Sequence, residues 1–275
     1  MLQLICSVSL CIENYVLPDT LNLTSGRVKM KVSTAVILAA GRGTRLAGVG
    51  LNVPKGLVEI GGEALVKRSV RLLQTRGIRD VLIVTGHQSF LYDRFAAAEH
   101  GVHCIYNENF ESKGSLESLR LALAAVTSPF LLLDSDILYE SRGLDALLNE
   151  PSENAALISG LTGSGDEYYV WENSTRHIYH FSKLLSDQPV APAGEHVGIL
   201  KVGERLHSAL HGLAPTWLVQ NPLEAYESLL IELLRDHPLK NTYVPDLRWS
   251  EIDDESMLDT ARRIIWPSLV SIGDL

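Results

Sequence analysis

A continuous apolar run that begins at Ala35 leads straight into a loop rich in glycine and arginine, and this junction constrains the fold more than any other feature. A short apolar run of this kind is typical of a buried strand. Glycine lets a backbone approach a ligand closely and adopt positive φ, and we expect both properties at Gly41 and Gly43. Arg45 and the later Lys55 add the positive charge that phosphate groups attract. The junction therefore predicts a strand that ends at a binding site for a nucleoside triphosphate.

Two commoner glycine motifs fit this loop less well. A dinucleotide-binding fingerprint requires a third glycine where Leu46 stands. A P-loop requires a Gly-Lys-Ser/Thr triplet, which does not follow Gly43. The longer string from Ala39 to Leu57, in which Pro54 precedes Lys55, is more specific than a Gly-x-Gly pair alone.

The composition favours a globular enzyme and argues against several other classes. The 275 residues are 46% hydrophobic and 21% charged, which is ordinary for a globular chain with one large or two small domains. The net charge of −9 argues against a nucleic-acid-binding surface. The three cysteines, at positions 6, 11 and 104, argue against a disulfide scaffold or a cysteine-built zinc site and favour the reducing cytoplasm.

The first 31 residues differ in character from the rest. Residues 2–12 are apolar, but no basic region precedes them and they are too few to span a membrane. We expect Met30 to be the natural start and residues 1–31 to be a non-catalytic extension, with a cryptic signal peptide as the alternative. Because the remainder contains no low-complexity tract or linker, we expect residues 32–275 to form one catalytic domain.

Apolar strands alternate with amphipathic helical patterns from the glycine loop onward, which predicts an α/β fold. The first half predicts helices over 64–76, 90–99 and 116–126 and strands over 81–85, 102–106 and 130–133. We expect a Rossmann-like, mostly parallel sheet with helices on both faces and a ligand at the carboxyl ends of its strands. The less regular second half predicts strands over 155–161, 167–171, 176–181, 197–202 and 242–244 and helices over 223–235 and 257–265.

Two acidic sites can supply metal ligands. The predicted strand 130–133 is followed by Asp134 and Asp136, and residues two apart on an extended chain project the same way. The pair can address one cation, unless Asp134 caps the next turn. The segment Glu251–Asp254 is a second acidic site, for which the alternative is a solvated turn. Carboxylate oxygens suit Mg²⁺, which also keeps water and phosphate ligands.

A further polar segment, Asn107–Glu117, precedes a predicted helix. Its Gly114-Ser115 turn can contact a phosphate or a base edge. The alternative is an ordinary helix cap by Ser115, although Ser118 stands where a full capping box needs a glutamate or glutamine.

Six short segments of this chain have counterparts in one enzyme family. They are the loop at 41–46, Pro54-Lys55, the loop at 113–116, Asp136, the strand entry at 165–170, and Glu251-Ile252-Asp253. On these segments the chain resembles the bacterial CTP-dependent nucleotidyltransferases of the NTP-transferase superfamily, in particular the CTP:phosphocholine and CTP:2-aminoethylphosphonate cytidylyltransferases. The resemblance extends over nearly all of residues 34–266.

The resemblance implies the nucleotide-diphospho-sugar transferase fold and an activity. The activity is transfer of CMP from CTP to phosphocholine or 2-aminoethylphosphonate, with release of pyrophosphate. Lys55 and Arg45 would be the catalytic cations, and Mg²⁺ would be bound by Asp136 and Asp253, with Asp254 as a helix N-cap. The implied nucleotide-binding residues are Ala39, Ala40, Gly41, Arg42, Gly43, Thr44, Asn107, Gly114 and Ser115.

The acceptor-binding half is expected to lie between residues 155 and 250. A choline headgroup is bound by aromatic faces, whereas a primary ammonium requires carboxylates or carbonyls. We expect Asp166, Glu167 and Tyr168 to contact the acceptor. The resemblance makes Lys183 a candidate partner of the acceptor phosphate or a metal-supporting lysine, with a solvated surface position as the alternative.

Rival functions remain open from the sequence. A sugar-1-phosphate nucleotidyltransferase would share the loop, although no further glycine-containing sugar motif follows the Asp-x-Asp. A non-catalytic nucleotide-binding regulator on the same fold would not need both metal carboxylates, and a glycosyltransferase would not need the glycine-arginine loop. Five histidines between positions 177 and 211 fit no closed zinc pattern. We expect a cytoplasmic enzyme that binds neither nucleic acid nor membrane, with the oligomeric state open and a homodimer among the options.

Overall fold

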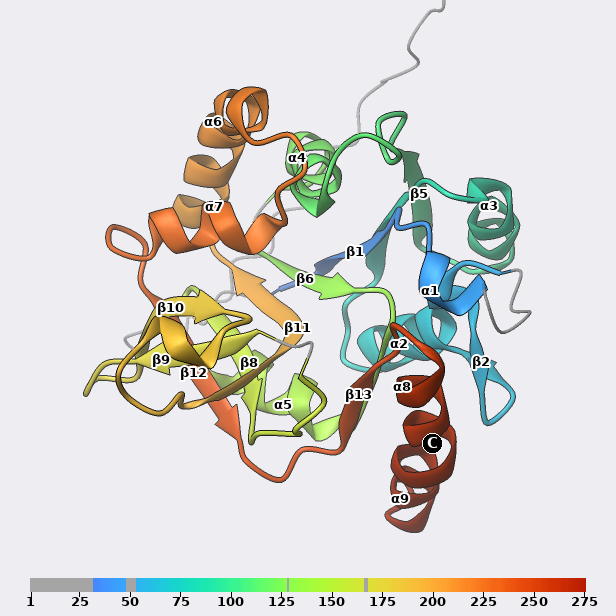
Figure 1. Cartoon of the computed structure of the whole chain (residues 1–275). Helices are drawn as coiled ribbons and strands as arrows, with labels where there is room; N and C mark the ends of the chain where they lie inside the picture. The colour runs from blue at the N-terminus through green and yellow to red at the C-terminus, as the bar shows by residue number, and fades with distance from the viewer. Residues whose placement is uncertain (1–31, 48–52, 128, 166–167) are drawn as a thin grey trace, which may run out of the picture. The chain divides into compact units, whose positions relative to one another are not determined.

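The computed structural model describes residues 32–47, 53–127, 129–165 and 168–275, and the elements below lie within these ranges (Figure 1). Residues 1–31 lie outside them, so the expected division into an extension and a catalytic domain stays a prediction. The strands of the main sheet are β1 Thr34–Ala39, β4 Asp80–Thr85, β5 Val102–Tyr106, β6 Phe130–Asp134, β8 Ala155–Ser159, β9 Tyr169–Glu172, β10 His177–Ser182, β11 Gly194–Val202 and β12 Leu239–Val244. Their order in space is β5-β4-β1-β6-β11-β8-β12-β10-β9.

The N-terminal half of the sheet is parallel, as the sequence predicts. β1 pairs in parallel with β4 and β6, and β4 pairs in parallel with β5. β1 is buried along its whole length and apolar from Ala35 onward, which suits a strand covered on both faces. In this register Ala39 lies opposite Thr85, and Leu38 lies opposite Asp134. The carboxyl ends of these strands therefore meet at one edge, where ligands bind in open α/β sheets.

β11 reverses the direction of the sheet, since it pairs antiparallel with β6 and with β8. Its first residues, Gly194 and Glu195, also pair antiparallel with β9. The register between β11 and β8 shifts between His196 and Leu200, where Gly198 adopts φ +80°. The second half of the sheet is consequently mixed rather than parallel.

Helices cover both faces of the sheet. One face carries α4 Ser115–Ala125, α6 Glu204–Gln220 and α7 Tyr226–Leu233, which Figure 1 shows grouped together. The other carries α2 Leu65–Gln74, α3 Ser89–Ala98 and α5 Arg142–Asn149. Successive residues of β1 divide between the two cores, with Val36 and Leu38 in the first and Ala35 and Ile37 in the second.

The sequence patterns predict no element over residues 204–220, yet α6 occupies this segment. Its buried residues recur every four positions and join the core of one face: Leu206, Leu210, Ala214 and Leu218. Pro215 lies inside the helix, where its ring removes the hydrogen bond to the carbonyl four residues earlier. The proline and the exposed Val219 obscure the helical period in the sequence.

Small elements bring the C-terminal segment beside the glycine loop. They are α1 Thr44–Ala47, η1 Lys55–Leu57, β2 Glu59–Ile60, β3 Glu63–Ala64, β7 Ile137–Tyr139, β13 Trp249–Glu251, α8 Glu255–Thr260, η3 Ala261–Ile265 and α9 Trp266–Ser271. A separate short turn, η2 Leu185–Asp187, follows β10. Leu46, Val58 and Leu138 share a third core with Ile252 and Leu258. The glycine loop and the acidic C-terminal segment are therefore held next to each other.

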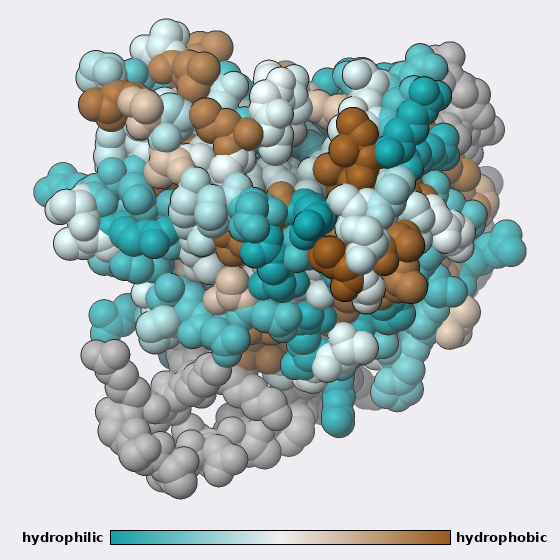
Figure 2. All heavy atoms as spheres, turned by 90° about the horizontal axis from the view of Figure 1, so that it is seen from below, coloured by the Kyte–Doolittle hydropathy of each residue, from teal (hydrophilic) through white to brown (hydrophobic). Residues whose placement is uncertain are grey.

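The surface is mixed in character. Figure 2 shows one face, on which apolar residues lie scattered among hydrophilic ones. Within the described ranges, no helix is both long enough and apolar enough to cross a membrane.

Candidate active site

A cleft of about 660 Å³ opens at the carboxyl ends of β1 and β6, where the sequence predicts a ligand. Its walls come from the glycine loop after β1, the loop before α4, the ends of β6 and β13, and the start of α7. The lining residues that matter below are Ala39, Ala40, Gly41, Arg42, Gly43, Arg45, Lys55, Asn107, Gly114, Ser115, Asp134, Asp136, Tyr168, Lys183, Tyr226, Glu227 and Glu251.

The backbone of the glycine loop packs directly against Lys55. Gly43 adopts φ +58°, and a Cβ built on it would lie 3.1 Å from Lys55 Cγ, so a side chain here would crowd the lysine. Gly41 does not adopt positive φ, and the sequence-based expectation for that residue is wrong. The space beside Gly41 is open, which leaves the backbone there accessible from the cleft.

The remaining loop residues lie around this backbone. Ala39 and Ala40 are buried where β1 ends, and His87 N donates a hydrogen bond to Ala40 O at 3.3 Å. Arg42 is exposed at the edge of the cleft. Thr44 begins α1, and its side chain lies outside the described part of the chain. Nucleotide binding by this loop stays a prediction.

The two predicted catalytic cations both reach Asp253. Lys55 Nζ lies 3.1 Å from Asp136 Oδ2 and also contacts Asp253 Oδ1. The Arg45 guanidinium contacts the other carboxylate oxygen of Asp253. Because Asp253 is only 4% exposed, these cations compensate a buried charge that would otherwise be strongly destabilising. The structure thus brings the four residues together, while their catalytic roles stay predictions.

Three carboxylates converge beside Lys55 and can hold a divalent cation. Ligand oxygens of Asp136, Glu251 and Asp253 lie within 4.8 Å of one another. The antiparallel pairing of β7 with β13 aligns them, and Ile252 N donates to Asp136 O at 2.9 Å. Hard carboxylate oxygens fit Mg²⁺, and the Lys55 ammonium among them shows that the group attracts positive charge. Glu251 was not predicted as a ligand, although the Glu-Ile-Asp segment contained the signal.

The neighbouring Asp254 has the structural role that the resemblance implies. Its Oδ1 accepts a hydrogen bond from Met257 N at 2.9 Å at the start of α8, and the N-cap prediction is confirmed. The cap sets the start of α8 directly after the carboxylate of Asp253.

The Gly114-Ser115 turn is anchored to the connection between α6 and α7. Gly114 N donates to Pro222 O at 3.0 Å, and Ser115 Oγ accepts from Tyr226 N at 3.1 Å. A Cβ on Gly114 would lie 2.1 Å from Glu224 O, so this close approach requires glycine. The side chain of Ser115 therefore ties α4 to α7 instead of capping α4, and contact of this turn with the nucleotide stays a prediction.

Asn107 shapes the same wall of the cleft. It is 1% exposed, its Nδ2 donates to Ser118 Oγ at 3.0 Å, and its Oδ1 accepts from Asn109 N at 2.9 Å. Glu117, equally buried, accepts hydrogen bonds from Asn109 Nδ2 at 3.1 Å and from Arg120 Nε at 2.9 Å. These bonds hold the loop, and direct nucleotide binding by Asn107 stays a prediction.

Two of the four predicted acceptor residues, Tyr168 and Lys183, are described by the structure. Asp166 and Glu167 lie outside the described residues. Lys183 Nζ lies 5.2 Å from the centroid of the Tyr168 ring, which is a cation–π distance. Both residues line the main cleft and also a second cavity of about 60 Å³ beside it.

Two further residues at this end of the cleft come from α7, and the sequence analysis did not assign them to the site. Tyr226 Oη donates to Asp134 Oδ2 at 3.3 Å, so Asp134 bonds to a helix 92 residues along the chain. Burial, together with nearby carboxylates, raises the pKa of Asp134 well above its usual range. Burial also raises the pKa of Glu227 to about 7. No local pattern could have identified these residues, because only the packing of α7 brings them to the cleft.

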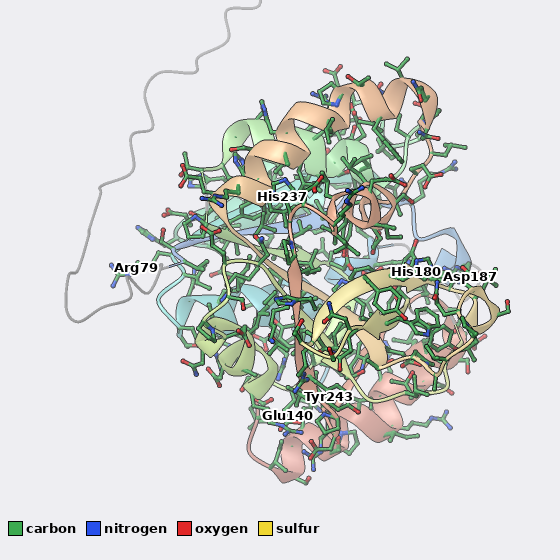
Figure 3. The ribbon with its side chains drawn as sticks, turned by 90° about the vertical axis from the view of Figure 1, so that its left-hand side faces the viewer. Arg79, Glu140, His180, Asp187, His237 and Tyr243 are labelled. Atoms are coloured by element: carbon green, nitrogen blue, oxygen red, sulfur yellow. The ribbon has the colours of Figure 1, made fainter. Side chains whose placement is uncertain are left out.

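The histidines that the structure describes form no metal-binding group, although the rings of His207 and His211 stack with their centroids 6.2 Å apart. Figure 3 shows His180 beside Asp187, with His180 Nε2 3.8 Å from Asp187 Oδ2, and shows His237 well apart from them. Among the described residues, the group with metal-binding spacing consists of carboxylates.

Comparisons with known proteins agree with this geometry. A solved structure, the inositol-1-phosphate CTP transferase from T. maritima, aligns with 82% of this chain and 91% of its own at a TM-score of 0.70 and 20% identity. This likeness confirms the predicted fold class.

The bifunctional IPC transferase and DIPP synthase of Aquifex aeolicus is 33% identical over 249 residues, or 88% of this chain and 54% of that protein. The CMP-5'-(3-aminopropyl)phosphonate synthase of Streptomyces rubellomurinus is 25% identical over 238 residues, or 80% of this chain and 37% of that protein.

Family membership rests on a broader match. The chain spans half or less of the length of the first curated relatives it matches. The family model described as the MobA-like NTP transferase domain matches residues 35–237, which include the glycine loop, Lys55 and Asp136. Because this match covers well over half of the sequence, the resemblance to nucleotidyltransferases is confirmed and the chain belongs to the MobA-like NTP transferase domain family.

Proposed function

We propose that this protein transfers CMP from CTP to a small amino-alcohol phosphate or phosphonate and releases pyrophosphate. The observation that carries the proposal is the meeting of Arg45 and Lys55 with Asp136 and Asp253 in one cleft. A nucleotidyl transfer needs cationic side chains that contact the triphosphate and carboxylates that bind a metal ion. Both groups must lie close enough to reach the same triphosphate.

The names of the relatives support CTP as the donor. One relative is named as a CMP-5'-(3-aminopropyl)phosphonate synthase, which supports an amino-phosphonate acceptor, whereas the solved structure is named as an inositol-1-phosphate CTP transferase, whose acceptor is a polyol phosphate. Each of these names describes a cytidylyl transfer to a phosphate or phosphonate oxygen. The retained cations and carboxylates support turnover rather than nucleotide binding alone.

The reaction requires no protein nucleophile. An oxygen of the acceptor phosphate or phosphonate attacks the α-phosphorus of CTP and forms a new P–O bond. The bond between the α-phosphorus and the oxygen that bridges to the β-phosphate breaks, and pyrophosphate leaves with that electron pair. A phosphomonoester has a second pKa of about 6 and is largely dianionic at neutral pH, so the acceptor oxygen needs no general base. Catalysis then depends on positioning and on charge stabilisation.

The residues of the cleft divide this work. Arg45 and the open backbone near Gly41 would hold the β- and γ-phosphates, and Lys55 would stabilise the charge that develops on the α-phosphate. Mg²⁺ bound by Asp136, Glu251 and Asp253 would supply further neutralisation of the phosphate oxygens. When the triphosphate enters, we expect Lys55 to exchange its present carboxylate partners for phosphate oxygens.

One incubation tests the proposal. The full chain is mixed with CTP, MgCl₂ and either 2-aminoethylphosphonate or phosphocholine, and mass spectrometry measures the CMP adduct while a coupled assay measures pyrophosphate. We expect adduct formation that EDTA abolishes. Parallel reactions with UTP, GTP and dTTP, and with a sugar 1-phosphate, test the rival sugar-nucleotide function. A sugar adduct in place of the phosphonate adduct would overturn the proposal.

A further inference from the structure

A second cavity of about 60 Å³ lies beside the main cleft and shares five lining residues with it. The shared residues are Asp134, Tyr168, Lys183, Glu227 and Glu251. The second cavity continues inward to the ring of Trp249 and to the backbone of β11 at Gly198. A site for one water needs roughly 10–15 Å³ on this measure, so the second cavity has room for a few heavy atoms.

Acidic side chains outnumber basic ones around the second cavity. Three carboxylates line it, from Asp134, Glu227 and Glu251, against the single ammonium of Lys183. His196 adds no positive charge at neutral pH, because burial lowers its pKa to about 4. Carboxyl groups therefore outnumber cationic groups along the walls of the second cavity.

Glu227 is the most deeply placed of these carboxylates. It is 5% exposed, and its pKa of about 7 shows that burial opposes its ionisation and that Lys183 only partly offsets this. A buried carboxylate of this kind gains most from a ligand that brings a positive charge and N–H donors.

The aromatic residues of the second cavity also suit an alkylammonium. Lys183 already places its own ammonium 5.2 Å from the Tyr168 ring centroid, which shows that this environment accepts such a group. Trp249 is 3% exposed, and its Nε1 donates to Ser159 Oγ at 2.8 Å, so its ring is fixed in orientation. A primary ammonium has three N–H donors for the carboxylates, whereas a neutral polyol brings no compensating charge.

We propose that the second cavity binds the primary ammonium group of the acceptor, with Glu227 as its counter-ion, and so selects aminoalkyl phosphonates or phosphates over neutral polyol phosphates. This inference rests on the proposed function, since it identifies the headgroup site of the same acceptor. The headgroup enters the second cavity while the phosphonate stays in the main cleft, near the cations that face CTP.

The test compares two acceptors that differ only at the headgroup: 2-aminoethylphosphonate and 2-hydroxyethylphosphonate. Isothermal titration calorimetry measures their binding to the full chain in the presence of Mg²⁺ and a non-reactive α,β-methylene analogue of CTP. We expect the amine to bind at least about tenfold more tightly, because its charged N–H donors pair with the buried carboxylate of Glu227. In Glu227→Gln the ratio should fall close to one.

A matched control uses the same helix. Glu232 is exposed on α7, and Glu232→Gln should keep the wild-type preference for the amine. Equal binding of both acceptors by the wild-type chain, binding of neither, or an unchanged ratio in Glu227→Gln would each overturn the inference. Turnover is measured separately. CMP transfer to both phosphonates at equal rates would be consistent with the proposed function. Tighter binding of the amine without any CMP adduct would contradict the proposed function but not the ammonium site.

Discussion

Lys55 Nζ lies 3.1 Å from Asp136 Oδ2, although 81 residues separate the two in the chain. Lys55 begins the 3-10 turn that follows Pro54, and Asp136 lies between β6 and β7. The contact therefore joins this turn to the edge of the sheet. The same ammonium contacts Asp253. Lys55 Nζ therefore lies between two carboxylates that could also bind a metal ion.

We expect Lys55→Ala to lower kcat/KM for the CTP-dependent reaction by roughly a hundredfold or more. Removing a single donor that stabilises developing charge costs about 3 kcal/mol of transition-state stabilisation in comparable sites. Steady-state kinetics with saturating Mg²⁺ measure the change. Lys67, exposed on α2, provides the control, and Lys67→Ala should retain normal kinetics. Near-normal turnover in Lys55→Ala would remove Lys55 from the catalytic role.

Lys55→Met should increase the affinity of the nucleotide-free protein for Mn²⁺ by roughly tenfold, because it removes a positive charge from among the metal carboxylates. Electron paramagnetic resonance of free Mn²⁺ measures binding directly and does not depend on turnover. Lys67→Met controls for the loss of a distant charge. An unchanged affinity would show that the lysine and the metal do not compete for these oxygens.

Asp253→Asn should abolish metal-dependent turnover while the fold persists. The substitution keeps the shape of the side chain but removes the charge that pairs with Lys55 and Arg45 and that a metal requires. The adjacent Asp254→Asn is a close control, because asparagine caps a helix about as well as aspartate. Activity assays and thermal melting of both variants distinguish the two positions. Substantial turnover in Asp253→Asn would exclude this carboxylate as a metal ligand.

The sequence indicates the nucleotide end of the site better than the acceptor end, for a physical reason. Local patterns encode the buried strand, the glycine turn and the acids at a strand end, and these place Lys55 and Asp136 correctly at the cleft. Glu227 reaches the cleft only through the packing of α7, whose sequence shows an ordinary amphipathic helix. The sequence analysis did not predict the long helix α6, because proline is strongly disfavoured inside helices and Pro215 lies within this segment. Tertiary packing of its buried face outweighs that local preference.

The irregularity in β11 yields a stability prediction. Gly198 adopts φ +80°, and a Cβ built there would lie 2.5 Å from Asp134 Oδ2, so Gly198→Ala should destabilise the fold by roughly 1–3 kcal/mol or more. Gly212, within α6, has nothing within 4 Å of such a Cβ, and Gly212→Ala should stabilise the fold by about 0.5–1 kcal/mol. Urea denaturation of both variants provides the comparison. A neutral Gly198→Ala would contradict both the backbone strain at φ +80° and the contact with Asp134.

His196 should make the fold sensitive to acid. Burial lowers its pKa from 6.5 to about 4, so between these values the unfolded chain binds more protons than the folded chain. The stabilisation from burying neutral His196 is therefore complete above pH 6.5 and is lost as the pH falls toward 4, by about 3 kcal/mol in total. Buried Glu227, with its raised pKa, acts in the opposite direction, so variants must be compared with the wild-type chain at each pH.

Urea titrations between pH 7 and 4.5 measure the free energy of unfolding. That of His196→Gln should decline less steeply with falling pH than that of the wild-type chain. His211 is exposed, and His211→Gln should keep the wild-type slope. Parallel curves for His196→Gln and the wild-type chain would contradict the assignment of this acid sensitivity to His196.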